Sequence, residues 1–175
     1  MKRHFTATAF VVHEGKTLLH WHRKLGQWMP PGGHLLPDED PVTGALREVR
    51  EETGLDTELL DSSHRHAFAY PEQVAPPHTI LIEDIDDAGD AHKHIDFIYF
   101  VRPATGSVQA LDGPALRPPS PDDELLWVSA AQLERGEALP RGNGSLVRVP
   151  EDVRALALEA IRTERAASER GPAAG

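Results

Sequence analysis

The chain of 175 residues has the length of one domain with a single core, and 39% hydrophobic with 26% charged residues is typical of a globular protein. Its formal net charge of −10 argues against sequence-independent binding to a nucleic-acid polymer. The absence of cysteine excludes disulfides, a thiol nucleophile and thiolate metal sites. No apolar run approaches the length of a signal peptide core or a membrane span, so we expect a cytoplasmic protein with no membrane partner.

The N-terminal segments predict a hairpin, a turn-rich stretch and a helix. Residues 6–23 form two β-rich runs around Glu14-Gly15-Lys16, and a short strand is expected over 33–36. A helix is predicted over 41–53 because Asp40 is a good capping residue, Pro41 suits the first helical position and Gly54 suits the stop. Its apolar stripe consists of Val42, Leu46, Val49 and Thr53.

The second half of the chain predicts strands and then helices. Strands are expected over 56–60, 65–70, 78–85, 94–102 and 124–129, with a long proline- and glycine-rich connection over 102–123. Ser129 is expected to cap a short helix over 130–136, and 150–166 read as an amphipathic helix. We therefore expect an α/β fold with a mixed sheet, a single domain over 1–166 and a flexible tail over 167–175.

Three glutamates crowd the predicted helix. Glu48, Glu51 and Glu52 occupy an arc of about 100° on the side away from the apolar stripe. Carboxylates at this spacing suit Mg²⁺ or Mn²⁺, which prefer oxygen ligands. Taken alone, the same residues would read as a solvated surface with an ordinary Arg47–Glu51 pair. The surrounding sequence decides between these interpretations.

From Gly33 to Leu55 the chain resembles the Nudix hydrolase signature, G-x5-E-x7-R-E-U-x-E-E-x-G-U, where U is a bulky aliphatic residue. Every fixed position matches over these 23 of 175 residues. Softer support comes from "WMPPGG" before this box and from "ELLWVSAAQL", which looks like the closing strand and helix of the family. Many relatives carry glutamate where this chain has Leu36, which we interpret as the loss of an accessory carboxylate.

The resemblance implies an α/β/α sandwich and hydrolysis of a nucleoside diphosphate linked to another group X. It implies Mg²⁺, with Mn²⁺ as a substitute, held by Glu48, Glu51, Glu52 and the Gly32 carbonyl. The general base stays unassigned. Arg47 is expected to orient a box glutamate through a bidentate ion pair. The remaining fixed residues are expected to be structural: Glu39 holds the loop, and Gly33 and Gly54 serve backbone geometry.

Outside the box, several residues are candidate substrate contacts. Arg23 and Lys24 suit a phosphate, and Glu124 lies where relatives often place a glutamate. Trp28 and Tyr70 suit stacking on a base, although core positions are the alternative for both. A further acidic metal ligand or general base is expected from a later loop, with Glu124 as the favoured candidate; the others are Glu83, Asp84, Asp86, Asp87, Asp90, Asp122 and Asp123.

A histidine-rich strand adds one more candidate site. His92, His94 and Asp96 fall on one face of the predicted strand, an arrangement that suits zinc. His94 and Asp96 are alternatively substrate contacts, and structural or solvent-facing roles are the common case for such residues.

The downstream markers for ADP-ribose and dinucleoside polyphosphate hydrolases are not cleanly met by Tyr70 and Pro71, and the extended coenzyme A motif is not evident, so X stays open. A non-catalytic nucleotide-sensing module is the alternative function, although such modules usually show an eroded box. The isopentenyl diphosphate isomerase branch fits poorly because it relies on a cysteine. A homodimer is compatible with the family, but no residue identifies an interface.

Overall fold

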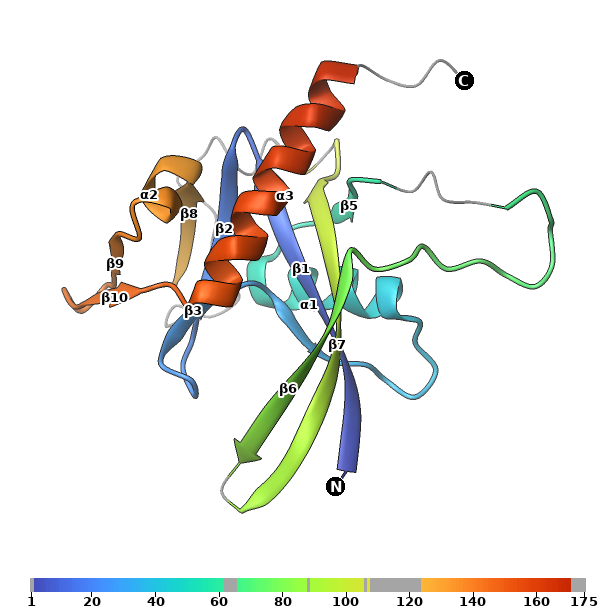
Figure 1. The fold of residues 1–175 in the computed structure, drawn as a ribbon, viewed down its shortest axis with the longest axis horizontal. Helices are drawn as coiled ribbons and strands as arrows, with labels where there is room; N and C mark the ends of the chain where they lie inside the picture. Colours follow the sequence, from blue (N-terminus) through green and yellow to red (C-terminus); the bar gives the residue numbers. More distant parts are fainter. Residues whose placement is uncertain (1, 62–65, 88, 106, 108–123, 171–175) are drawn as a thin grey trace.

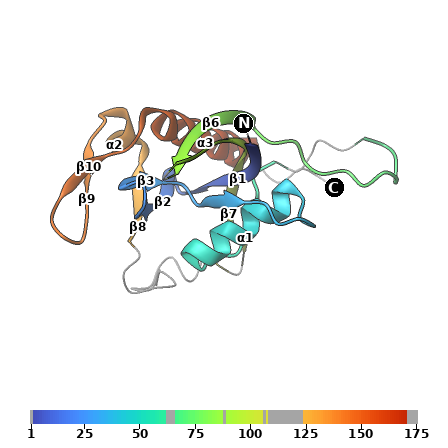
Figure 2. The same ribbon diagram turned by 90° about the horizontal axis from the view of Figure 1, so that it is seen from below.

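A computed structural model of the chain describes residues 2–61, 66–87, 89–105, 107 and 124–170. It consists of a large mixed sheet with helices on both faces (Figures 1 and 2). In the described residues the sheet strands are β1 (Lys2–His13), β2 (Lys16–His22), β3 (Gln27–Met29), β4 (Gly32–His34), β5 (Thr57–Leu59), β6 (Thr79–Asp87), β7 (Asp90–Pro103) and β8 (Leu125–Ser129). The helices are α1 (Pro41–Thr53), α2 (Ala130–Glu134) and α3 (Glu151–Arg170).

The two longest strands form the centre of the sheet. β1 and β7 pair in parallel from Lys2 with His92 through Val11 with Val101. β2 extends the sheet beyond β1 and carries β3 and β8, while β4 pairs with β1, and β5 and β6 pair with β7. All of these outer pairings are antiparallel. The expected hairpin is confirmed: Glu14 and Gly15, at φ 49° and 72°, form its two-residue turn.

The helices cover opposite faces of the sheet (Figure 2). Along β1, Ala7, Ala9 and Val11 pack on the α1 side, with Ala45 and Val49 of that helix. The intervening residues of the same strand pack with α2 and α3, in a cluster that includes Phe10, Val12, Leu133, Ala157 and Ile161. Because side chains alternate across a strand, one sequence supplies both cores. This is the expected α/β/α sandwich.

The α1 helix begins and ends as the sequence predicts. Asp40 Oδ1 accepts the backbone N–H groups of Val42 (2.9 Å) and Thr43 (3.1 Å), which satisfies two of the free donors at the helix start. Gly54 closes the helix at φ 75°, and its N–H donates to the carbonyl of Arg50. This short, well-capped helix carries the three box glutamates Glu48, Glu51 and Glu52.

Two expectations need correction. The strand predicted over 65–70 is absent from its described part, 66–70, since this segment runs out from the sheet without a partner strand (Figure 1). Alternating apolar residues favour a strand only where a neighbour supplies hydrogen bonds. The expected flexible tail is helical over 167–170, because α3 continues to Arg170; 171–175 lie outside the described residues. The structure also adds a small hairpin of β9 (Ala138–Pro140) and β10 (Leu146–Arg148).

Within the residues that the structure describes, no helix combines the length and apolar character needed to cross a membrane.

Candidate functional site

The candidate site lies where α1 meets the backbone of β4. Two box carboxylates reach this strand from one side of the helix. Glu52 Oε2 accepts the backbone N–H of Gly32 at 3.0 Å. The Glu48 carboxylate lies so close to Gly33 that a Cβ added there would sit 2.6 Å from Glu48 Oε1 and 2.7 Å from Cδ. A side chain at this glycine would therefore displace a carboxylate from the site.

Gly32 is equally restricted, but by side-chain and backbone atoms of β1. A Cβ at Gly32 would lie 2.5 Å from Thr8 Oγ1 and 2.9 Å from the carbonyl oxygen of Ala7. These atoms belong to β1, with which β4 pairs. Both glycines therefore permit a close approach, one to the neighbouring strand and one to a box glutamate.

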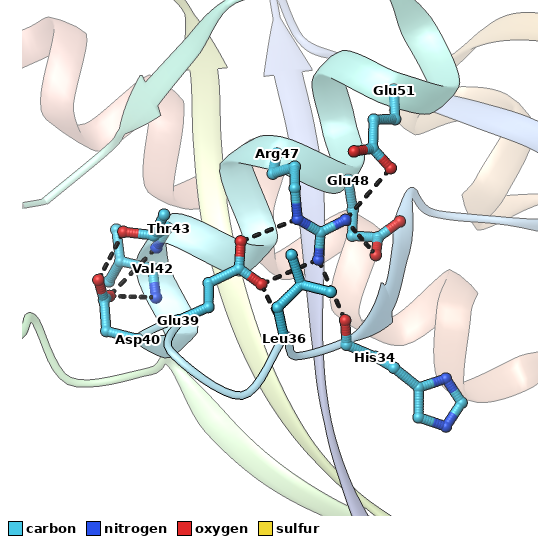
Figure 3. A network of polar contacts seen from close by, with 9 residues as sticks. All are labelled: His34, Leu36, Glu39, Asp40, Val42, Thr43, Arg47, Glu48 and Glu51. Atoms are coloured by element: carbon cyan, nitrogen blue, oxygen red, sulfur yellow. Dashed lines mark hydrogen bonds and ion pairs between the residues drawn. The ribbon is translucent and has the colours of Figure 1, made fainter.

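Arg47 holds the box together (Figure 3). Its guanidinium makes a bidentate pair with Glu39, Nε to Oε1 at 2.8 Å and Nη2 to Oε2 at 2.9 Å. Nη1 reaches Glu48 Oε1 at 2.8 Å and Glu51 Oε2 at 3.2 Å, and Nη2 also donates to the carbonyl of His34 at 3.1 Å. The expected bidentate ion pair is present, and its partner is Glu39. Glu39 also accepts the N–H of Leu36 at 3.1 Å, so it holds the loop before the helix.

Around Arg47, negative charge exceeds positive charge. The hydrogen bonds from Arg47 lower the pKa of Glu39, whose side chain is only 6% exposed. The same contacts raise the pKa of Arg47. Three carboxylates, those of Glu39, Glu48 and Glu51, share this one guanidinium. An additional cation beside Glu48 and Glu51 would relieve the repulsion among them.

The third box carboxylate has a different neighbour. Glu52 is partly buried, and its Oε2 lies 3.5 Å from His20 Nε2 on β2. Glu48 is more deeply buried than Glu52, whereas Glu51 is largely exposed. Hard oxygen donors converging from one helix on a glycine backbone fit a divalent ion such as Mg²⁺.

A pocket of about 570 Å³ opens beside this site, with Gly32 and Gly33 in its wall. Its floor carries alternate residues of β1 and β7, namely Thr6, Thr8, Phe10, Asp96 and Ile98, and the first turns of α3 contribute Asp152, Val153 and Leu156. The remaining walls come from β6, from residues between 22 and 30, and from Asp90 and four histidines, His4, His34, His92 and His94. The pocket is large enough for a nucleoside-sized ligand.

Buried acidic groups give the pocket its polarity. The buried Asp96 accepts hydrogen bonds from the hydroxyls of Thr6 (3.0 Å) and Thr8 (2.8 Å). Burial raises its pKa, although both hydrogen bonds oppose the rise. Burial also raises the pKa of Glu83, with further contributions from the charges of Asp96 and Asp152. Such a lining favours ligand groups that donate hydrogen bonds.

Of the predicted substrate contacts, only some line the pocket. Lys24 lines the pocket, whereas Arg23 does not. Trp28 is buried at 1% exposure and packs edge-on against Trp21, so its ring has no face for a base and the core alternative holds. Tyr70 is 88% exposed on the projecting segment and does not line the pocket.

Glu124 also lies away from the pocket lining. Its carboxylate accepts hydrogen bonds from Arg141 Nη2 and from the N–H of Gly142, both at 2.6 Å, and thereby connects the start of β8 to the β9–β10 turn. Of the other acidic candidates, Glu83, Asp84, Asp86 and Asp90 line the pocket. The side chain of Asp87, together with Asp122 and Asp123, lies outside the described residues.

Sequence reasoning missed the pocket floor formed by Thr6 and Thr8. The available signal was two hydroxyls at alternate positions in the otherwise apolar run of residues 5–12. It also missed His4 and His34, which the structure brings beside His92 and His94, whereas Asp96 bonds to the threonines instead. His92, His94 and Asp96 line the same pocket, as expected for one strand face, but of the candidate zinc set only His92 and His94 belong to the group of possible ligands.

Known proteins share sequence with this chain across most of the described fold. The family model for the NUDIX domain matches residues 2–148. The chain belongs to the NUDIX family of hydrolases. This Nudix chain is 29% identical to human "Diphosphoinositol polyphosphate phosphohydrolase 2" over 133 residues, which cover 61% of this chain and 71% of that protein. It is 30% identical to "RNA pyrophosphohydrolase" from Erythrobacter litoralis over 115 residues, 65% of each chain.

Two further matches differ in extent. A segment of 51 residues is 45% identical to "Octanoyltransferase" from Myxococcus xanthus, but it spans 29% of the Nudix chain and only 14% of that protein. Among solved structures, a NUDIX-family hydrolase from Clostridium perfringens superposes with a TM-score of 0.61 at 24% identity, covering 93% of this chain and 98% of the other. That likeness supports the fold.

Proposed function

We propose that this Nudix hydrolase is a divalent-metal-dependent pyrophosphohydrolase acting on a nucleoside di- or triphosphate, or on a nucleoside diphosphate linked to a group X. The observation that carries the proposal is the placement of Glu48 and Glu52 against the Gly32–Gly33 backbone, in the wall of a nucleoside-sized pocket. Relatives named as phosphohydrolase and pyrophosphohydrolase support the same reaction class.

Glu48, Glu51, Glu52 and the carbonyl of Gly32 would hold Mg²⁺ or Mn²⁺. When bound, such an ion neutralises phosphate charge and acidifies a water. Arg47 positions Glu48 and Glu51, and one of the three glutamates, or an acidic residue of a later loop, takes the proton from the attacking water. The base and sugar lie in the pocket over Thr6, Thr8 and Asp96, and Lys24 meets a phosphate at the rim.

The test is phosphate and pyrophosphate release over a substrate panel with Mg²⁺ and with Mn²⁺. The panel contains nucleoside di- and triphosphates, dinucleoside polyphosphates, nucleotide sugars, a diphosphoinositol polyphosphate and 5′-triphosphorylated RNA. Glu52→Gln is compared with Glu137→Gln, which alters an exposed residue paired with Arg135.

We expect metal-dependent turnover of a small nucleotide that falls at least ~100-fold in Glu52→Gln and is unchanged in Glu137→Gln. Nucleotide binding without turnover on any compound would refute the hydrolase proposal and favour a nucleotide-sensing module. The net charge of −10 predicts that the RNA is a poor substrate.

A further inference from the structure

Four histidines from three strands meet at the edge of the pocket: His4 of β1, His34 of β4, and His92 and His94 of β7. We call them the histidine cluster. His4 and His94 are direct partners in the parallel β1–β7 pair, and His34 ends the strand that pairs with β1. The cluster therefore depends on sheet pairing between segments that are far apart in the chain.

The spacing of the ring nitrogens matches a metal site. One nitrogen from each ring lies within 4.8 Å of the others. His4 Nδ1 is 3.3 Å from His34 Nε2, and His92 Nε2 is 3.2 Å from His94 Nε2. Four nitrogens placed tetrahedrally at about 2.05 Å from Zn²⁺ are separated by roughly 3.3 Å. Two ring-nitrogen distances in the cluster have this value already, and no pair of the four ligand atoms needs to close by more than about 1.5 Å.

The tautomer of His92 also fits a metal site. Its Nδ1 lies 2.7 Å from the carbonyl oxygen of Asp90, an acceptor that requires a donated N–H. In a neutral ring, Nε2 then carries the lone pair, and this atom faces His94. A backbone carbonyl that fixes the ring and its tautomer in this way is the usual second contact of a metal-ligating histidine.

Two of the four rings, those of His34 and His94, have lowered pKa values. Burial and the neighbouring histidines lower the pKa of His94 to about 4. Burial and two of the same neighbours lower the pKa of His34, against a smaller opposing effect of Glu48. The lowered pKa values reduce the competition of protons with a metal ion for these two rings.

We propose that His4, His34, His92 and His94 bind one divalent transition-metal ion of the Zn²⁺ class, at a site separate from the box carboxylates. Four nitrogen donors select Zn²⁺ over Mg²⁺, and Co²⁺, Ni²⁺ and Cu²⁺ bind the same set. Four protein ligands close the coordination sphere, as in structural rather than catalytic sites. The ion connects β1, β4 and β7 and anchors His34, whose carbonyl accepts a hydrogen bond from Arg47. The proposal is independent of the proposed hydrolase activity.

The experiment uses full-length protein without a polyhistidine tag, stripped with a chelator and dialysed against Zn²⁺ at pH 7.5. Bound metal is measured by elemental analysis, and Co²⁺ absorption spectra report the coordination geometry. His34→Asn and His94→Asn are compared with His13→Asn, a histidine of the same β1 strand outside the cluster. His34 is exposed, so its variant is the safer one for folding, and circular dichroism checks both.

We expect one equivalent of Zn²⁺, a tetrahedral Co²⁺ spectrum, and a loss of affinity of at least ~100-fold in each cluster variant but not in His13→Asn. Zn²⁺ should raise the thermal midpoint of the unsubstituted chain and of Glu52→Gln, because it binds only the folded state. Unchanged Zn²⁺ binding in folded His34→Asn and His94→Asn would overturn the proposal. So would loss of Zn²⁺ binding in Glu52→Gln, which would locate the ion at the box. Since none of these readouts uses turnover, failure here is distinguishable from failure of the hydrolase proposal.

Discussion

Removal of the Arg47 guanidinium should strongly destabilise the fold. In Arg47→Met, the carboxylate of Glu39, 6% exposed, loses a bidentate partner, and Glu48 loses a contact of 2.8 Å. Breaking a buried ion pair from one side costs about 3–5 kcal/mol. Arg47 is 22% exposed, so we lower the expected loss in unfolding free energy to ~2–4 kcal/mol.

The chain contains a matched control. Arg102 and Glu58 have the same Nε–Oε1 distance of 2.8 Å as Arg47 and Glu39, but their side chains are 51% and 47% exposed. Solvent screens such a pair, so Arg102→Met should cost less than ~1 kcal/mol. Urea unfolding followed by tryptophan fluorescence measures both variants, with the m-value as a check on two-state behaviour.

Two additions sharpen the test. Glu39→Gln in the Arg47→Met background should recover part of the loss, because the buried charge is gone, and Mg²⁺ should recover part by pairing with the remaining glutamates. If Arg47→Met and Arg102→Met lose the same stability, the burial argument is refuted.

The same ion pair predicts a dependence on acid. Arg47 lowers the pKa of Glu39 below its ordinary 4.5, so the unfolded chain binds this proton more readily. The stabilisation is therefore complete above about pH 4.5 and is lost as the pH falls through the folded-state pKa. Urea midpoints measured from pH 6 to 3 should fall less in Arg47→Met than in the unsubstituted chain, and parallel curves would contradict this assignment.

The remaining predictions concern the first glycine of the box and the N-terminal cap of α1. Gly33→Ala should lower turnover at least ~10-fold with little loss of stability, because its Cβ would meet the movable end of Glu48 at 2.6 Å. Gly142→Ala is the control, since its nearest contact is 3.7 Å; equal turnover in both variants would show that the position of Glu48 is unimportant. Asp40→Ala should cost ~1 kcal/mol in urea unfolding, because two helix N–H groups lose their acceptor, and no loss would mean that water replaces the cap.

Local patterns explain what could be predicted from the sequence. The α1 helix depends on its own cap, stripe and stop, so its bounds of 41–53 agree with the prediction. The hairpin turn at Glu14-Gly15 and the Ser129 cap of α2 are local in the same sense. Residues 66–70 show the limit of such patterns, because a strand also needs a neighbour.

By itself, the sequence determined which carboxylates share one helix face, since spacing along a helix sets direction. Only the tertiary structure decided which partner each of the other candidate residues has. Arg47 forms its bidentate pair with Glu39, Trp28 fills the core, and Asp96 accepts hydrogen bonds from the threonines of β1. The histidine cluster likewise draws on positions 4, 34, 92 and 94, which the β1–β7 and β1–β4 registers bring together. Register depends on burial across the whole sheet, and no local pattern contains that information.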